Sequence, residues 1–155
     1  MAFSVFISYS THDLASATAL GSWMTAAGAQ PFLAEYSLPP GRPLAADIVG
    51  AIQRCDLFLL LWSRNARESE WVPQEIGIAR GTQKPIMPVV LQHGLELPGF
   101  IKDLKYLSLY PDPSASVQWL HRYVMDKVKE KQINAAVGLG IVGAVLLLLF
   151  SGKGK

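Results

Sequence analysis

The sequence predicts an α/β fold, a doubly wound parallel sheet with helices on both faces, followed by one apolar helix at the C-terminus. Short apolar runs alternate with segments of helical periodicity, which is the order of a βαβ protein. Leu57–Trp62 is apolar at every position, as expected for a strand covered on both faces. Residues 133–150 contain no charge. As a helix they are about 27 Å long, close to the roughly 30 Å hydrocarbon core of a bilayer.

Composition limits the classes of protein and of site. Of the 155 residues, 50% are apolar and 17% are charged, and the formal net charge is +2. This charge is too small to indicate a nucleic-acid partner. The single cysteine, Cys55, excludes an internal disulfide and fits a reducing compartment. His12, His93 and His121 do not have metal-ligand spacing, so we expect neither a metal site nor a cofactor. The start of the chain does not have the pattern of a signal peptide.

The first part of the chain reads as strand, helix and strand. Residues 3–9 alternate in polarity and are rich in aromatic and β-branched side chains, which favours a strand. Ser10 and Asp13 have the spacing of a helix cap, and helical periodicity then continues until Gly28 ends it. Residues 30–33 form a short second strand.

The middle of the chain contains a long loop, two helices and the most apolar strand. Residues 35–43 include three prolines, which exclude regular structure and predict a loop. Residues 44–52 are apolar on one side of a helix. The third strand covers residues 57–62. The next helix covers residues 71–80 and tolerates Pro73 in its first turn.

The last third predicts two more strands and a long helix. The strands are expected at residues 86–91 and 106–109. The helix begins at Ser114, and one of its sides carries apolar residues, namely Val117, Leu120, Val124 and Val128. Because no glycine or proline follows before Gly138, we expect this helix to continue into the apolar run without a hinge.

The candidate site follows the third strand. Chemistry in α/β proteins is placed beyond the carboxyl ends of the strands, at the point where the strand order reverses. Trp71 and Glu75 are four residues apart, so on a helix they share one face. Ser8, Tyr9 and Ser10 end the first strand. A carboxylate with an aromatic neighbour is therefore the feature to explain. Packing at the end of the strand explains Tyr9 equally well, and packing of the helix onto the sheet is the stronger explanation for Trp71.

Four segments together resemble the Toll/interleukin-1 receptor (TIR) domain family. They are residues 3–9, residues 31–33 with the Pro-Pro-Gly of 39–41, residues 55–63, and the Ser-Glu-Trp-Val-Pro-Gln-Glu of 69–75. Their order and spacing match the family over roughly residues 1–130. The resemblance implies a flavodoxin-like five-stranded sheet of order 2-1-3-4-5. The bacterial branch of the family, with many members in antiphage immunity, is the most similar.

The resemblance also implies an activity. TIR domains of the NADase type cleave the bond between nicotinamide and ribose with a glutamate, and the matching residue is Glu75. Breaking this C–N bond builds positive charge on the sugar, which a fixed carboxylate stabilises. NAD⁺ is then the substrate, and no cofactor is implied. A response-regulator-like receiver domain has the same sheet order but needs acidic residues after the first strand and at the end of the third. This chain has Tyr9-Ser10 and Trp62-Ser63 at those places, so we exclude a receiver domain.

A substrate pocket is implied around Glu75. Its expected residues are Ser8, Tyr9, Ser10, Ala34, Glu35, Leu38, Gly41, Arg42, Ser63 and Trp71. The loop from Glu35 to Pro43 matches the family's BB loop, which gates the pocket and makes contacts between TIR domains. Many members carry an acid directly after the second strand, whereas here Ala34 precedes Glu35.

The expected organisation is a TIR domain at 1–131, a transmembrane tail anchor at 132–151 and a short basic tail at 152–155. Ala136, Gly140 and Ala144 form a small-xxx-small stripe that lets helices approach closely, if the anchor self-associates. The TIR domain is expected on the cytoplasmic side of the membrane. Activity is expected on self-assembly, because the resemblance implies a pocket completed by a neighbouring copy. The alternative from another class is a non-catalytic adaptor that recruits other TIR proteins to the membrane.

Overall fold

The computed structural model describes residues 1–34 and 45–151, with side chains described as far as residue 140. The strands are β1 (Ser4–Ser8), β2 (Gln30–Leu33), β3 (Leu57–Trp62), β4 (Ile86–Val90) and β5 (Leu107–Ser108). The helices are α1 (Leu14–Ala26), α2 (Ala46–Arg54), α3 (Arg64–Glu68), α4 (Val72–Gly81) and α5 (Ser114–Ser151), with short 3-10 turns η1 (Thr11–Asp13) and η2 (Gly99–Ile101). The strands form one parallel sheet of order β2-β1-β3-β4-β5, which confirms the predicted topology.

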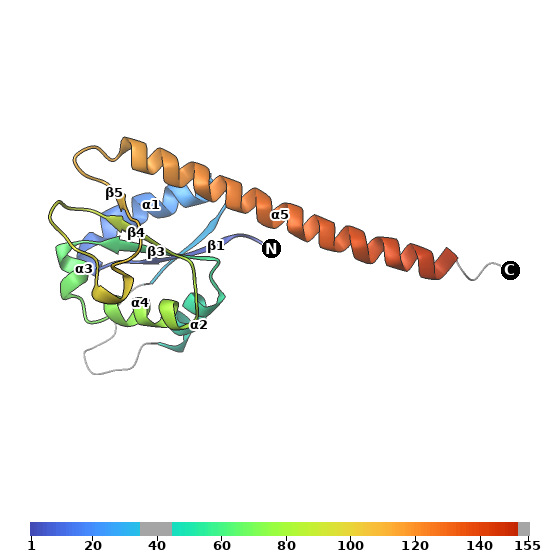
Figure 1. The fold of residues 1–155 in the computed structure, drawn as a ribbon, viewed down its shortest axis with the longest axis horizontal. Helices are drawn as coiled ribbons and strands as arrows, with labels where there is room; N and C mark the ends of the chain where they lie inside the picture. The colour runs from blue at the N-terminus through green and yellow to red at the C-terminus, as the bar shows by residue number, and fades with distance from the viewer. Residues whose placement is uncertain (35–44, 152–155) are drawn as a thin grey trace.

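One face of the sheet is covered by α1 and α5 (Figure 1). Successive residues of a strand point to opposite faces, so Val5, Ile7 and Tyr9 pack on this side. Leu120 and Val124 of α5 are buried against them, as the helical periodicity predicts. This layer attaches the first half of α5 firmly to the domain.

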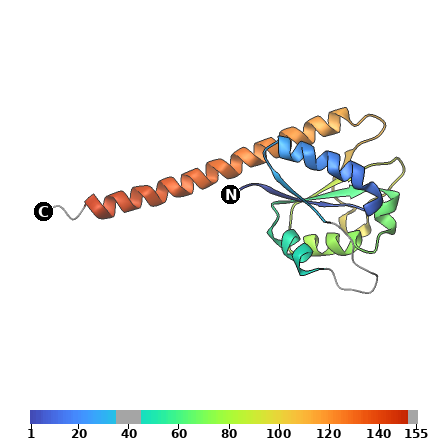
Figure 2. The ribbon, with the colours of Figure 1, turned by 180° about the vertical axis from the view of Figure 1, so that it is seen from behind.

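The other face is covered by α2 and α4, seen from behind in Figure 2. Here Phe6 stacks on both Phe32 and Phe58 with ring centroids 5.5 Å apart in each pair. Ile52 and Ile76 from the two helices are fully buried in the same cluster. Ser8 follows Phe6 on this face of β1, so the sequence alternation itself brings a hydroxyl beneath α4.

The β2 edge of the sheet is blocked by a proline. The amide of Gln30 points inward and donates to the carbonyl of Phe3, 2.8 Å away. Pro31 therefore occupies an outward-facing position, where any other residue presents an N–H to solvent. The missing donor protects this edge against pairing with a strand from another molecule.

The structure corrects several predicted boundaries. β1 ends at Ser8, and the expected cap at Ser10 starts the 3-10 turn η1, with α1 following at Leu14. The helix expected from Trp71 begins one residue later, and β4 and β5 are shorter than predicted. Helix α3 was not predicted. Its five residues are too few to show periodicity, and the hydroxyl of Ser63 caps it by accepting from the amide of Ala66 at 2.9 Å.

Helix α5 continues unbroken from Ser114 to Ser151, which confirms the absence of a hinge. It projects beyond the end of the sheet at which the strands begin (Figure 1). Within the part of the chain that the structure describes, no helix is both long and apolar enough to cross a membrane. Most of the predicted span at 132–151, with the side chain of Ala144, lies outside the described side chains. The loop of residues 35–43 likewise lies outside the described residues.

Candidate functional site

The site is built where the strand order reverses. β1 pairs with β2 on one side and with β3 on the other, and the chain leaves β1 and β3 in different directions. After β1 it enters η1 and α1, whereas after β3 it enters α3 and α4. A crevice opens at such a point beyond the carboxyl ends of the strands. The residues gathered there are polar, in contrast to the apolar strands beneath them.

Glu75 lies at this point with its side chain fully buried. The hydroxyl of Ser8, also fully buried, donates to its Oε2 atom at 2.5 Å. The backbone amide of Glu75 donates to the backbone carbonyl of Trp71 at 3.0 Å, and Glu75 lies in the first turn of α4. Placement near a helix N-terminus favours a negative charge. The structure thus joins the side chains of two predicted site residues, Ser8 and Glu75, and orients the carboxylate with a hydrogen bond from the sheet.

A second polar cluster joins the turns after β1 and β3. The hydroxyl of Ser63 donates to Oδ2 of Asp13, and the side-chain amide of Asn65 donates to Oδ1 of the same carboxylate at 3.1 Å. Because Ser63 also caps α3, these contacts hold the two turns at a fixed separation. Asp13 and Asn65 were missed as site residues. The signal available was their position after strands 1 and 3.

A cavity of about 350 Å³ opens beside this cluster. Its lining residues are Ser10, Thr11, His12, Asn65, Glu68, Ser69 and Trp71. Its volume is at the lower end of the range of ligand pockets, and its lining is mostly polar. Ser10 and Trp71, two of the predicted pocket residues, therefore face this space. Glu75 is not among the lining residues, so its carboxylate lies beneath the cavity and not in its wall.

The remaining predicted site residues are distributed as follows. Tyr9 is buried on the opposite face of the sheet, in the cluster with α1 and α5, which is the packing alternative stated above. Ala34 is buried after β2, among the residues beneath α2 and α4. Ser63 acts as a helix cap. The loop residues expected in the pocket lie outside the described part of the chain, namely Glu35, Leu38, Gly41 and Arg42.

A parallel sheet of order β2-β1-β3-β4-β5 with helices on both faces and a buried carboxylate at its switch point defines a doubly wound α/β domain. The family model described as "TIR domain" matches residues 5–122. The chain therefore belongs to the TIR domain family. No curated protein sequence resembles the chain closely enough to count as a match.

Solved structures share the fold. The TIR domain of a Toll-related receptor from Hydra magnipapillata is 23% identical, with a TM-score of 0.63, and the match covers 77% of this chain and 96% of that one. A CMP N-glycosidase from Clostridium botulinum is 19% identical, with a TM-score of 0.59 and coverage of 77% and 98%. A TIR-STING receptor from C. gigas is 24% identical over 74% of this chain, with a TM-score of 0.57, but the match spans only 38% of that longer protein.

Proposed function

We propose that this chain is a membrane-anchored TIR-domain NAD⁺ nucleosidase that cleaves the nicotinamide–ribose bond when copies assemble. The observation that carries the proposal is the buried carboxylate of Glu75, held by the hydroxyl of Ser8 at the switch point of the sheet. A carboxylate kept in one position and shielded from water stabilises developing positive charge far better than an exposed one.

Cleavage of the nicotinamide–ribose bond requires few other groups from the protein. The C–N bond breaks with its electron pair moving to the pyridinium ring, so nicotinamide leaves as a neutral molecule. The sugar passes through an oxocarbenium-like state, and water adds to the same carbon and loses a proton. Glu75 opposes the positive charge of that state. Attack by a group of the same substrate in place of water yields a cyclic product.

The burial of Glu75 supports activation by assembly. Because the side chain has no exposed surface, a substrate reaches it only after a neighbouring element moves. Contact with a second copy supplies such a change, and anchoring in a plane raises the effective concentration of copies. A role in immune defence, as a signal generator or effector, is consistent with this form of activation.

Membrane anchoring by residues 132–151 is part of the proposal. Its support is the charge-free sequence of 133–150 and its continuity with α5. In the described beginning of this run, Ile133 (61%) and Leu139 (74%) are exposed. Cofractionation of the full-length chain with lipid vesicles after alkaline extraction tests this part alone.

The activity test compares variants of the full-length chain in vesicles. We expect Glu75→Gln to lower NAD⁺ turnover by about 100- to 1,000-fold, the usual effect of losing one preorganised electrostatic group. Glu70→Gln is the matched control, since Glu70 is an exposed glutamate five residues earlier. Equal turnover in wild type and Glu75→Gln would reject the assignment. If copies bind each other but consume no NAD⁺ at any density of protein in the vesicles, the non-catalytic adaptor is favoured.

A second substrate is needed to test which ring the enzyme releases from the sugar. The similar structure from C. botulinum is named as a CMP N-glycosidase, and such an enzyme also breaks a bond between a sugar carbon and a ring nitrogen. Incubation with CMP in parallel with NAD⁺ distinguishes the two substrate classes. Cleavage of CMP alone would keep the role of Glu75 and replace the substrate.

A further inference from the structure

The end of the domain from which α5 departs is rich in basic side chains. We call it the basal surface; its basic residues are Arg54, Lys84, Lys127, Lys129 and Lys131. The carbonyl of Arg54 accepts from the hydroxyl of Ser4 at 3.5 Å, and Lys84 lies two residues before Ile86, the first residue of β4, so both lie where the strands begin. The carboxylates nearby are Asp56, Asp126 and Glu130, of which Asp56 and Glu130 are paired with Lys131 and Lys127.

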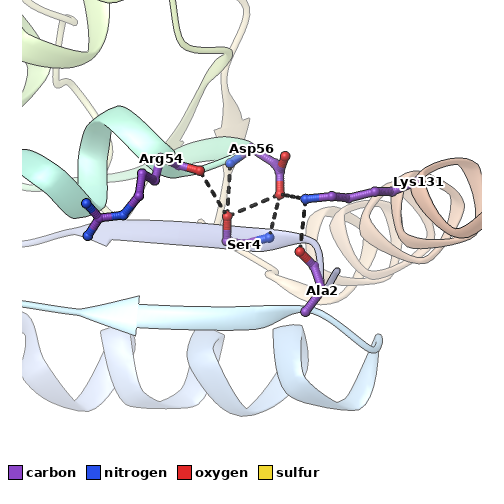
Figure 3. Close-up of polar contacts among 5 residues, drawn as sticks. All are labelled: Ala2, Ser4, Arg54, Asp56 and Lys131. Atoms are coloured by element: carbon purple, nitrogen blue, oxygen red, sulfur yellow. Dashed lines mark hydrogen bonds and ion pairs between the residues drawn. The ribbon is translucent and has the colours of Figure 1, made fainter. Parts of the chain in front are cut away.

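Helix α5 is fixed to this surface at one node (Figure 3). Nζ of Lys131 lies 2.6 Å from Oδ2 of Asp56 and donates to the carbonyl of Ala2 at 3.0 Å. The same Oδ2 accepts from the amide of Ser4 at 2.8 Å and from its hydroxyl at 3.1 Å. The starts of β1 and β3 are therefore joined to α5 three residues after Val128, the last residue that the helix buries in the core.

The apolar run follows the node immediately. At 1.5 Å per residue, Ile133 lies about 3 Å beyond Lys131 and about 9 Å beyond Lys127 along the axis. The headgroup layer on each side of a bilayer is about 5–8 Å thick, given the difference between the total and hydrocarbon thickness. If the run enters lipid at Ile133, Lys129 and Lys131 lie at headgroup depth and Lys127 lies at the outer boundary of the headgroup layer.

We propose that the basal surface docks on an anionic lipid bilayer and turns the Glu75 end of the domain away from it. This inference rests on the proposed membrane anchoring. Basic side chains next to a membrane entry point attract anionic headgroups, and the fixed node at Lys131 prevents the domain from tilting freely about its anchor. The substrate crevice, at the opposite ends of the strands, then opens toward the aqueous phase.

Depth-dependent quenching tests this orientation in the full-length chain. One label is attached at Gln53→Cys beside the basal surface and another at Glu68→Cys beside the cavity, both at exposed positions. Cys55 stays unlabelled, because burial raises the pKa of its thiol and removes it from solvent. The six residues of β3 separate the two ends by about 20 Å.

In vesicles with about a third of anionic lipid and spin-labelled headgroups, we expect strong quenching at position 53 and none at position 68. Arg54→Glu with Lys84→Glu should reduce quenching at position 53, whereas the control pair Arg64→Glu with Arg67→Glu, exposed on α3, should not. Equal quenching at both positions, or quenching that is the same in neutral vesicles, would overturn the docking while leaving the anchor intact. Failure to cofractionate with vesicles would overturn the anchor and the docking together. Neither result bears on the role of Glu75, because NAD⁺ turnover of wild type and Glu75→Gln can also be compared without vesicles, with the protein clustered in solution.

Discussion

The ion pair between Lys131 and Asp56 gives the sharpest stability prediction. Lys131→Met keeps the aliphatic stem and removes the ammonium, so the contacts to Asp56 at 2.6 Å and to the carbonyl of Ala2 at 3.0 Å are lost. The two side chains are 27% and 28% exposed, between the extremes of a surface pair and a buried one. We expect a loss of about 1–2 kcal/mol in the free energy of unfolding, or about 3–8 °C in Tm for a domain of this size.

The effect should depend on pH with a definite sign. Burial raises the pKa of Asp56, but hydrogen bonds from Lys131 and Ser4 outweigh it and hold the pKa below its usual value. A carboxyl with a lowered pKa in the folded state stabilises the protein above its unfolded-state pKa, and this contribution disappears as the pH falls through the folded-state pKa. The difference between wild type and Lys131→Met should therefore be complete at pH 7 and shrink below about pH 4.

The assay is urea unfolding of the full-length chain in mild detergent at a series of pH values. Lys129→Met is the matched control, because Lys129 is exposed on the same turn of α5. A difference between wild type and Lys131→Met that is equal at pH 7 and pH 3, or no larger than that of the control, would refute the role assigned to the pair.

Three further predictions concern the site and the helix ends. Ser8→Ala removes the hydrogen bond to the Glu75 carboxylate, so we expect kcat for NAD⁺ to fall about tenfold or more while KM changes little; a change in KM alone would contradict a positioning role. Ser63→Ala removes the cap of α3 and the contact with Asp13, so we expect the free energy of unfolding in urea to fall by about 1–2 kcal/mol. An unchanged free energy of unfolding would show that the cap is dispensable. Gly28→Ala places a side chain at a φ of +88°, so we expect a loss of about 1 kcal/mol or more in the same assay, and unchanged stability would show that the turn relaxes.

The sheet could be predicted from the sequence because each of its longer strands carries an unambiguous apolar pattern. Leu57–Trp62 is buried at every position, and its bounds match the prediction. The reversal of order between β1 and β3 came from the family resemblance, because apolar pattern does not specify which strands are neighbours. Helix α3 escaped prediction because a single capping hydroxyl, not periodicity, determines it.

The sequence pointed to individual residues of the candidate site but not to its geometry. Glu75 and Ser8 were each expected in it, yet the bond between them depends on where α4 crosses β1, which no local pattern encodes. The alternation of β1 did contain one unused signal. Since Phe6 and Ile7 face opposite layers, Ser8 and Tyr9 must also diverge, and only Ser8 lies beneath α4.

The unbroken course of α5 has a geometric consequence for assembly. Each residue of an α-helix turns the chain by about 100°, and no glycine or proline interrupts α5 before Gly138. The number of residues between the node at Lys131 and the stripe that begins at Ala136 therefore determines how the domain is rotated about the helix axis relative to that stripe. One inserted residue between them rotates the crevice by about 100° relative to the stripe, and seven restore it to within about 20°. If copies associate through their apolar helices, the length of this short segment determines which sides of their domains meet.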